Sequence, residues 1–107
     1  MLISTMNDLP GSEVTEVLGE VFGLTVRARH VGSQVGAGLK SLVGGELRGQ
    51  TKMLVESRQQ AQLRLEEEAT ARGADAVLAM RFDATEIGGG WQEICAYGTA
   101  VKTRRLS

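Results

Sequence analysis

The stretch DAVLAMRFDATEIGGGWQEICAYGTAVKTR, residues 75–104, decides the fold because it reads as two strands around one tight loop. Three consecutive glycines, Gly88 to Gly90, separate two runs rich in β-branched and aromatic side chains. Such runs favour strands, and glycine accepts the positive φ angles that hairpin loops require. We therefore predict a β-hairpin with strands over residues 75–87 and 91–104.

The register of this hairpin follows if Ile87 lies opposite Trp91. The same register sets three further pairs across the strands: Phe82 with Ala96, Met80 with Gly98, and Asp83 with Cys95. One face then places large side chains opposite small ones. We expect a helix backbone to lie close against that face.

A third, longer strand is predicted over residues 13–30, because valine, threonine and phenylalanine recur there without helical periodicity. Gly19 and Gly23 indicate bulges or the close approach of another backbone. Alternation puts apolar residues on both faces: Leu18, Phe22, Leu24, Val26 and Ala28 on one, and Val17, Val21 and Thr25 on the other. A strand that is apolar on both faces needs a cover on each side.

Two helices are expected between this strand and the hairpin. A short helix covers residues 34–43, with Ser33 as its N-cap. A long helix covers residues 46–72, where five apolar residues form one stripe: Leu47, Leu54, Ala61, Leu65 and Ala69. The alternative is two shorter helices with a break near Gly49 or Thr51, since glycine weakens a helix. The pattern as a whole predicts an α+β fold with an antiparallel sheet.

The composition is that of one globular domain spanning residues 1–107. The chain is 42% hydrophobic and 23% charged, which argues against disorder, and no run reaches the roughly 18 apolar residues of a membrane span. Twelve basic residues balance thirteen acidic ones, so neither nucleic acid nor a membrane is expected as the main partner. The chain shows no leader pattern, and its one cysteine allows no internal disulfide, so we expect a cytoplasmic protein.

The predicted long helix is large for so small a chain. A helix over residues 46–72 would span about 40 Å at ~1.5 Å per residue. A compact chain of about 100 residues has a radius of gyration of only about 13 Å. A compact monomer would struggle to cover such a helix, so we expect a homo-oligomer, with Leu47, Leu54 and Leu65 as contact residues.

Catalytic chemistry is not expected. A catalytic nucleophile needs a nearby base and an orienting carboxylate. His30 is the single histidine and Cys95 the single thiol of the chain. His30 stands at the end of a predicted strand, and Cys95 stands in the middle of another, where the role of a small buried apolar residue is favoured. We therefore expect the protein not to be an enzyme.

A metal site is the first binding hypothesis. Cys95 would offer a soft thiolate, and Asp83 beside it and Glu93 on the same face would offer hard carboxylates. No CxxC, HxxxH or HExxH spacing occurs in the sequence. One subunit thus supplies an incomplete tetrahedral set, and another subunit would have to complete a site for a divalent or heavy-metal ion.

An anion site is the second binding hypothesis. The segment GSQVGAGLKS at residues 32–41 follows a strand and opens a helix, the context in which backbone amides bind phosphate. Arg27 and Arg29 stand just upstream. The segment departs from both glycine-rich phosphate motifs, so tight packing of its glycines stays open as the alternative. The candidate residues are Ser33, Gly36, Gly38 and Lys40.

The sequence resembles the YbjQ family of small, uncharacterised bacterial proteins almost from end to end. The resemblance is most specific at three motifs, LVGG at 42–45, GADAV at 73–77 and GTAV at 98–101. It implies a compact α+β subunit in which a curved antiparallel sheet packs against a short and a long helix. It also implies assembly of these subunits into a five-fold ring.

The family carries a heavy-metal-binding label, but its pattern contains no fixed set of Cys and His ligands. No ligand role therefore passes from the family to His30 or Cys95. Taken with the residues themselves, the resemblance leads us to expect a bacterial homo-oligomer, a pentamer, that binds a metal ion or small ligand at subunit interfaces. The alternative is a purely structural or protein-interaction ring without a small ligand.

Overall fold

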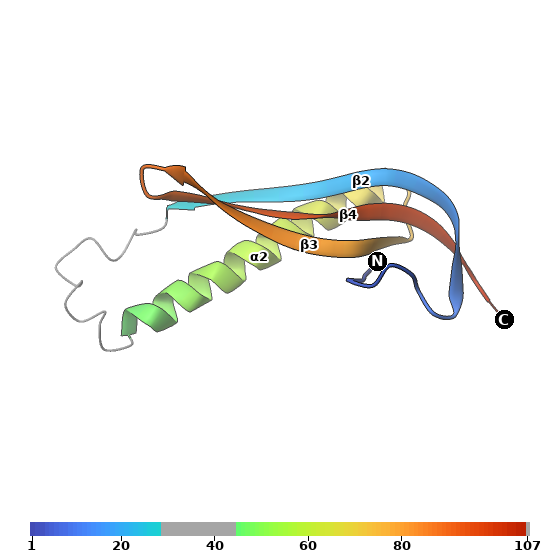
Figure 1. The fold of residues 1–107 in the computed structure, drawn as a ribbon, viewed down its shortest axis with the longest axis horizontal. Helices are drawn as coiled ribbons and strands as arrows, with labels where there is room; N and C mark the ends of the chain where they lie inside the picture. The colour runs from blue at the N-terminus through green and yellow to red at the C-terminus, as the bar shows by residue number, and fades with distance from the viewer. Residues whose placement is uncertain (29–44, 107) are drawn as a thin grey trace.

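The computed structural model describes residues 1–28 and 45–106. Within them the chain forms one helix and a four-stranded sheet, so the fold is α+β, as predicted (Figure 1). The elements are β1 (Leu2–Ile3), β2 (Ser12–Ala28), α2 (Gly45–Ala71), β3 (Ala76–Gly88) and β4 (Trp91–Arg105). The short helix expected over residues 34–43 lies outside the described residues.

The sheet has the strand order β1-β3-β4-β2 and is open. β4 is central and pairs antiparallel with both β2 and β3, as expected. β1, however, pairs parallel with β3, which places Leu2 beside Ala76 and Ile3 beside Val77. The sheet is therefore mixed, and the prediction of a wholly antiparallel sheet was wrong. A strand of two residues has no periodicity from which it could have been predicted.

The middle of the hairpin has the predicted register, from the pair Arg81 and Tyr97 to the pair Glu86 and Gln92. Phe82 lies opposite Ala96, and Asp83 lies opposite Cys95. The prediction for the loop end was wrong, because Trp91 pairs with Gly88 and not with Ile87. The loop is thus shorter than three residues and consists of two glycines with positive φ, the geometry that a tight hairpin turn needs: Gly89 at 62° and Gly90 at 81°.

The other end of the hairpin contains a bulge, so the expected pair of Met80 and Gly98 does not form. The register shifts between Leu78 and Arg81, where Ala79 has a positive φ of 54°. The bulge frees backbone amides for the N-terminal segment: Ala79 donates to the Met6 carbonyl at 2.8 Å. The bulge is therefore where the N-terminal segment docks.

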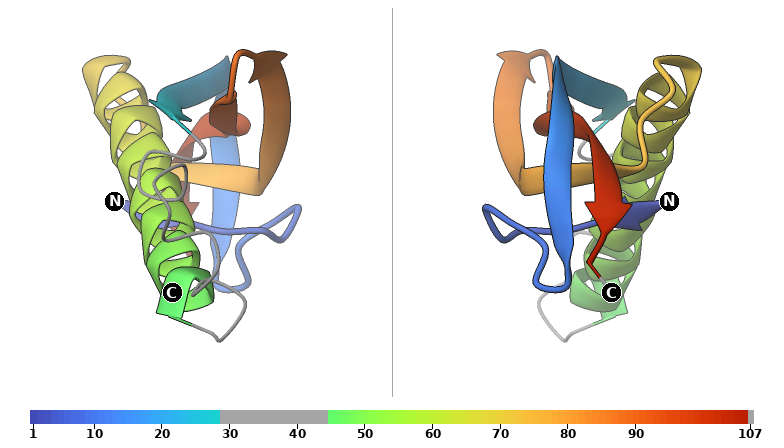
Figure 2. Two further views of the ribbon diagram at one scale, coloured as in Figure 1. Left: turned by 90° about the vertical axis from the view of Figure 1, so that its left-hand side faces the viewer. Right: turned by 90° about the vertical axis from the view of Figure 1, so that its right-hand side faces the viewer.

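Helix α2 is continuous, so the alternative of two helices with a break near Gly49 or Thr51 was wrong. It lies across one face of the sheet (Figures 1 and 2). Its buried residues Ala61, Leu65 and Ala69 form one core cluster with residues of the three long strands, Val21, Val77, Met80, Ile94, Ala96 and Ala100. The long helix thus packs on its own sheet through one stripe. None of the described helical residues forms a span long and apolar enough to cross a membrane.

Among the residues that the structure describes, the opposite face of the sheet is covered only at the end near the N-terminal segment. There Leu9 packs on a small second cluster made of Ala76, Leu78 and Val101. The molecule is elongated, with extents of 59 × 24 × 17 Å and a radius of gyration of 17.6 Å. Within residues 1–28 and 45–106, α2 and the short N-terminal segment therefore leave much of this face without a cover.

Candidate functional site

The uncovered face of the sheet carries a row of apolar side chains from β2. Phe22, Leu24 and Val26 are 46%, 38% and 53% exposed. The neighbouring residues of the same strand, Val21 and Thr25, are buried beneath α2. The prediction that β2 is apolar on both faces is confirmed for residues 21–26, and one of those faces has no cover within the described chain. The prediction that Leu18 shares the face of Phe22 was wrong: Leu18 packs against the core beneath α2, because the register shifts between Val17 and Gly19.

Cys95 lies in the middle of this uncovered face. β4 places it between Asp83 of β3 and Leu24 of β2. Burial raises the pKa of the Cys95 thiol, and the negative charges of three carboxylates, Glu93, Asp83 and Glu20, raise it further. The thiol is therefore a poor nucleophile at neutral pH, and its surroundings are acidic.

The predicted metal ligands are brought only partly together. The register sets Asp83 opposite Cys95 as expected, and Glu93 lies opposite Thr85 on the same face. The described part of the chain nevertheless contains no group of three or more His, Cys, Asp and Glu side chains that could hold a metal ion. A site at Cys95 thus stays a prediction that needs ligands from a second subunit.

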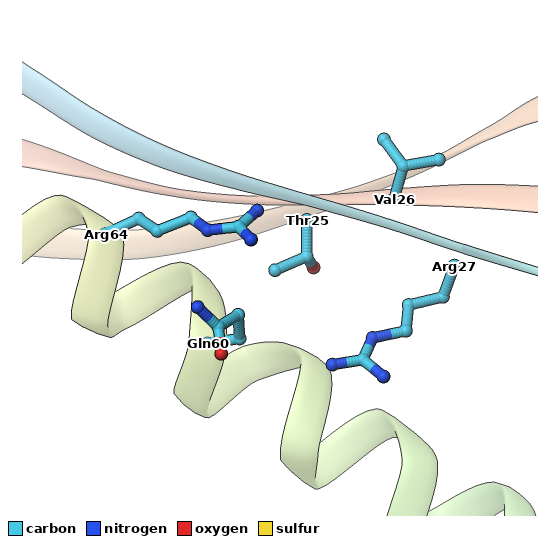
Figure 3. A pocket seen from close by; sticks show the side chains of 5 residues that line it. All are labelled: Thr25, Val26, Arg27, Gln60 and Arg64. Carbon is cyan, nitrogen blue, oxygen red and sulfur yellow. The ribbon is translucent and has the colours of Figure 1, made fainter.

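A cleft of about 260 Å³ lies between the last residues of β2 and the middle of α2 (Figure 3). Five residues line it: Thr25, Val26, Arg27, Gln60 and Arg64. The Arg64 guanidinium donates through Nη1 to the Leu24 carbonyl at 2.6 Å. The Thr25 hydroxyl donates to the Ser57 carbonyl at 3.3 Å. The helix and the strand are thereby joined along the floor of the cleft.

From the sequence, Arg27 was expected only as a cation upstream of the glycine-rich segment. Neither Arg64 nor Gln60 was predicted to belong to a binding site. The signal for both was weak, because arginine and glutamine are ordinary on the polar side of a helix. Their spacing of four residues does place both on one helix face. No sequence pattern could predict that this face of the helix lies next to Arg27 of β2.

The other predicted residues are placed as follows. Ser33, Gly36, Gly38, Lys40 and His30 lie outside the described residues. Leu47 belongs to the first part of α2, and Leu54 is 39% exposed on the same helix. Leu65 is completely buried in its own core, which leaves it no surface for a neighbouring subunit. A contact role in an oligomer therefore stays a prediction for Leu54 and has no support from the position of Leu65.

Known proteins resemble the chain over its whole length. A UPF0145 protein of Streptomyces coelicolor is 70% identical over 105 residues, which cover 98% of this chain and 99% of that protein. A UPF0145 protein of Acidothermus cellulolyticus is 64% identical over 107 residues, which cover 100% and 99%. The crystal structure of a protein of unknown function from Pediococcus pentosaceus, of the DUF74 family, superposes with a TM-score of 0.58.

That structure is 17% identical in sequence and covers 97% of this chain and 98% of its own, so the likeness supports the fold alone. The model of the YbjQ family, which is described as "Putative heavy-metal-binding", matches residues 1–104. The sequence resemblance is thus confirmed over nearly the whole chain, and the chain belongs to the YbjQ family.

Proposed function

We propose that this protein is a self-assembling, non-enzymatic binding protein, in which a second copy of the chain covers the exposed face of the sheet. The observation that carries the proposal is the apolar row of Phe22, Leu24 and Val26 opposite the helix. Contiguous apolar surface of this kind marks interaction sites. An exposed apolar surface of a second copy could pack on it, with side chains from both copies forming a joint core.

The shape of the subunit supports the same proposal. A radius of gyration of 17.6 Å is well above the roughly 13 Å of a compact chain of this length, so the subunit has a large surface for its mass. A second copy is the partner we propose because it is always present at equal concentration. We propose a closed ring, in which the row of each copy packs against a different exposed surface of the next copy, since two identical rows that met each other would close a two-fold dimer.

The assembly can be tested by native mass spectrometry and light scattering of the whole chain. Leu24→Glu places a charge in the apolar row, and we expect it to dissociate the oligomer while circular dichroism stays that of the folded chain. Leu63→Glu is the matched control, because Leu63 is 49% exposed on α2, away from the row. A monomeric wild-type protein, or an oligomer that Leu24→Glu leaves intact, would contradict the proposal.

A heavy-metal ion at Cys95 is the ligand that we propose for this assembly. The pairing of Cys95 with Asp83 supports it, as does the family description. The same carboxylates that raise the pKa of the thiol would attract a cation. Binding has to displace the thiol proton, so affinity should rise as pH approaches the raised pKa of Cys95.

The test is uptake of Cd²⁺ by the oligomer, measured by native mass spectrometry after buffer exchange. We expect Cys95→Ser to abolish stoichiometric uptake. Asp83→Asn should weaken it, and Asp8→Asn, remote from Cys95 in the described structure, should not. Uptake retained by Cys95→Ser would exclude this site. An intact ring with no uptake would favour the alternative, a purely structural or protein-interaction ring.

A further inference from the structure

The cleft between β2 and α2 gathers positive charge, and no carboxylate among its described lining residues balances it. Arg27 and Arg64 both line it, and none of the other three lining residues is acidic. Within residues 1–28 and 45–106, the ion pairs join Arg72 to Glu68 and Arg104 to Glu13, so neither cleft arginine has an acidic partner there. Two unbalanced guanidinium groups repel each other, and a bound anion would remove that repulsion.

The Arg64 side chain is already held in place for such a role. Its Nη1 donates to the Leu24 carbonyl, which fixes the guanidinium at the wall of the cleft (Figure 3). A guanidinium has five N–H donors in a rigid fork, and this bond uses one of them. The remaining donors can bind two oxygens of one ligand with little further loss of side-chain entropy.

Arg27 and Gln60 supply the other donors. Arg27 extends from β2 towards the helix, whereas Val26, its neighbour, points to the other side of the sheet (Figure 3). Gln60 stands one helical turn before Arg64 and offers an amide NH₂ group. Thr25 gives its hydroxyl hydrogen to the Ser57 carbonyl, so it offers a ligand no donor. The cleft thus presents donors and positive charge from both walls.

We propose that this cleft binds the phosphate group of a small ligand, as a dianion held between Arg27 and Arg64. Two guanidinium groups match a doubly charged, multi-oxygen group better than a singly charged carboxylate. The volume of about 260 Å³ lies just below the 300–1,000 Å³ of sites for drug-sized molecules, so the ligand is small. All lining residues belong to one subunit, and the inference is therefore independent of self-assembly and of metal binding at Cys95.

The experiment is a titration of the whole chain with inorganic phosphate, followed by amide NMR at constant ionic strength with chloride as the balancing anion. We expect saturable shifts at Thr25 to Arg27 and at Gln60 and Arg64. Arg27→Gln should weaken phosphate binding about tenfold or more, because it removes charge-assisted hydrogen bonds. Arg64→Lys keeps the charge but loses the fork, and it should weaken binding as well.

The control is Arg105→Gln, which makes the same change of charge at the opposite end of the β2–β4 pair, where Arg105 lies opposite Ser12. It should bind phosphate as the wild type does. Equal affinity in Arg27→Gln and Arg105→Gln would overturn the proposal, as would the absence of saturable shifts around the cleft. Acetate binding as tight as phosphate binding would overturn the assignment to a phosphate group. Tighter binding of methyl phosphate than of inorganic phosphate would support an organic phosphate as the natural ligand.

Discussion

Gly23 shows how one residue sets the distance between the helix and the sheet. A Cβ atom at this position would lie 2.2 Å from the Ala61 carbonyl oxygen and 2.4 Å from the Leu65 amide nitrogen. Both atoms belong to the helix backbone, which cannot move aside as a flexible side chain can. The register of β2 against β4 is regular here, so Gly23 marks the close approach of α2, whereas the bulge lies at Gly19, whose φ is +105°.

We predict that Gly23→Ala destabilises the fold by about 3 kcal/mol, at the upper end of the cost of overpacking, because the whole helix has to shift. Gly49→Ala makes the same substitution in α2, where an added Cβ meets nothing within 4 Å. It should stabilise the protein by about 0.5–1 kcal/mol through helix propensity. Urea denaturation measures the free energy of unfolding of both variants, which should fall for Gly23→Ala and rise for Gly49→Ala. Equal effects would mean that the close contact at Gly23 is absent in solution.

At the scale of elements, β2 is the long edge strand of the sheet, opposite the short edge strand β1, and side chains of α2 protect the β2 edge. Arg64 donates to the Leu24 carbonyl at 2.6 Å, and Arg72 donates to the Leu18 carbonyl at 3.3 Å. A long edge strand with free carbonyls would be a template for strands of other chains. Helix arginines that occupy those carbonyls would steer association away from this edge, which agrees with the proposed assembly through the exposed face.

We predict that Arg72→Met increases β-aggregation more than it lowers stability. The variant loses one hydrogen bond to the edge and an exposed ion pair with Glu68, which together contribute about 1 kcal/mol. The Leu18 carbonyl is then free to pair with another chain. Thioflavin fluorescence during prolonged incubation measures the effect, with Arg105→Met as the control. Identical aggregation of the two variants would show that Arg72 does not protect the edge.

The elements that could be predicted from the sequence are those with a strong local pattern. The helix over 46–72 and the strands over 75–87 and 91–104 were within one residue of the observed bounds, since periodicity and the three glycines mark them. The bulge at Ala79 could not be predicted, because it depends on tertiary hydrogen bonds to the N-terminal segment, which no local pattern indicates. The cleft likewise depends on how α2 crosses β2, which no local pattern encodes.

At the scale of the whole molecule, the described residues form their main core along one face of the sheet, beneath α2, and a small second cluster near the N-terminal segment. The stability of the subunit and its assembly should therefore be linked, because a second copy would supply the missing cover. We predict that the melting temperature rises with protein concentration, since binding between folded copies favours the folded state. Differential scanning fluorimetry over a hundredfold range of concentration measures this dependence.

Leu24→Glu should melt at a lower temperature that no longer depends on concentration, since the charge removes the contact between copies. Leu63→Glu should keep the dependence of the wild type. A melting temperature of the wild type that stays constant over the whole range would mean that the subunit is stable without a partner, and that the exposed row on β2 serves no assembly.

The elongated shape of the subunit also affects how its size would be read in solution. By the scaling of compact chains, a radius of gyration of 17.6 Å corresponds to a globular protein of about 240 residues. Elution from a gel-filtration column follows hydrodynamic size and not mass, so a single elongated subunit would elute earlier than a compact globular protein of the same mass. Its apparent mass from the elution volume would exceed its true mass, and a method that measures mass directly is needed to distinguish such a monomer from an oligomer.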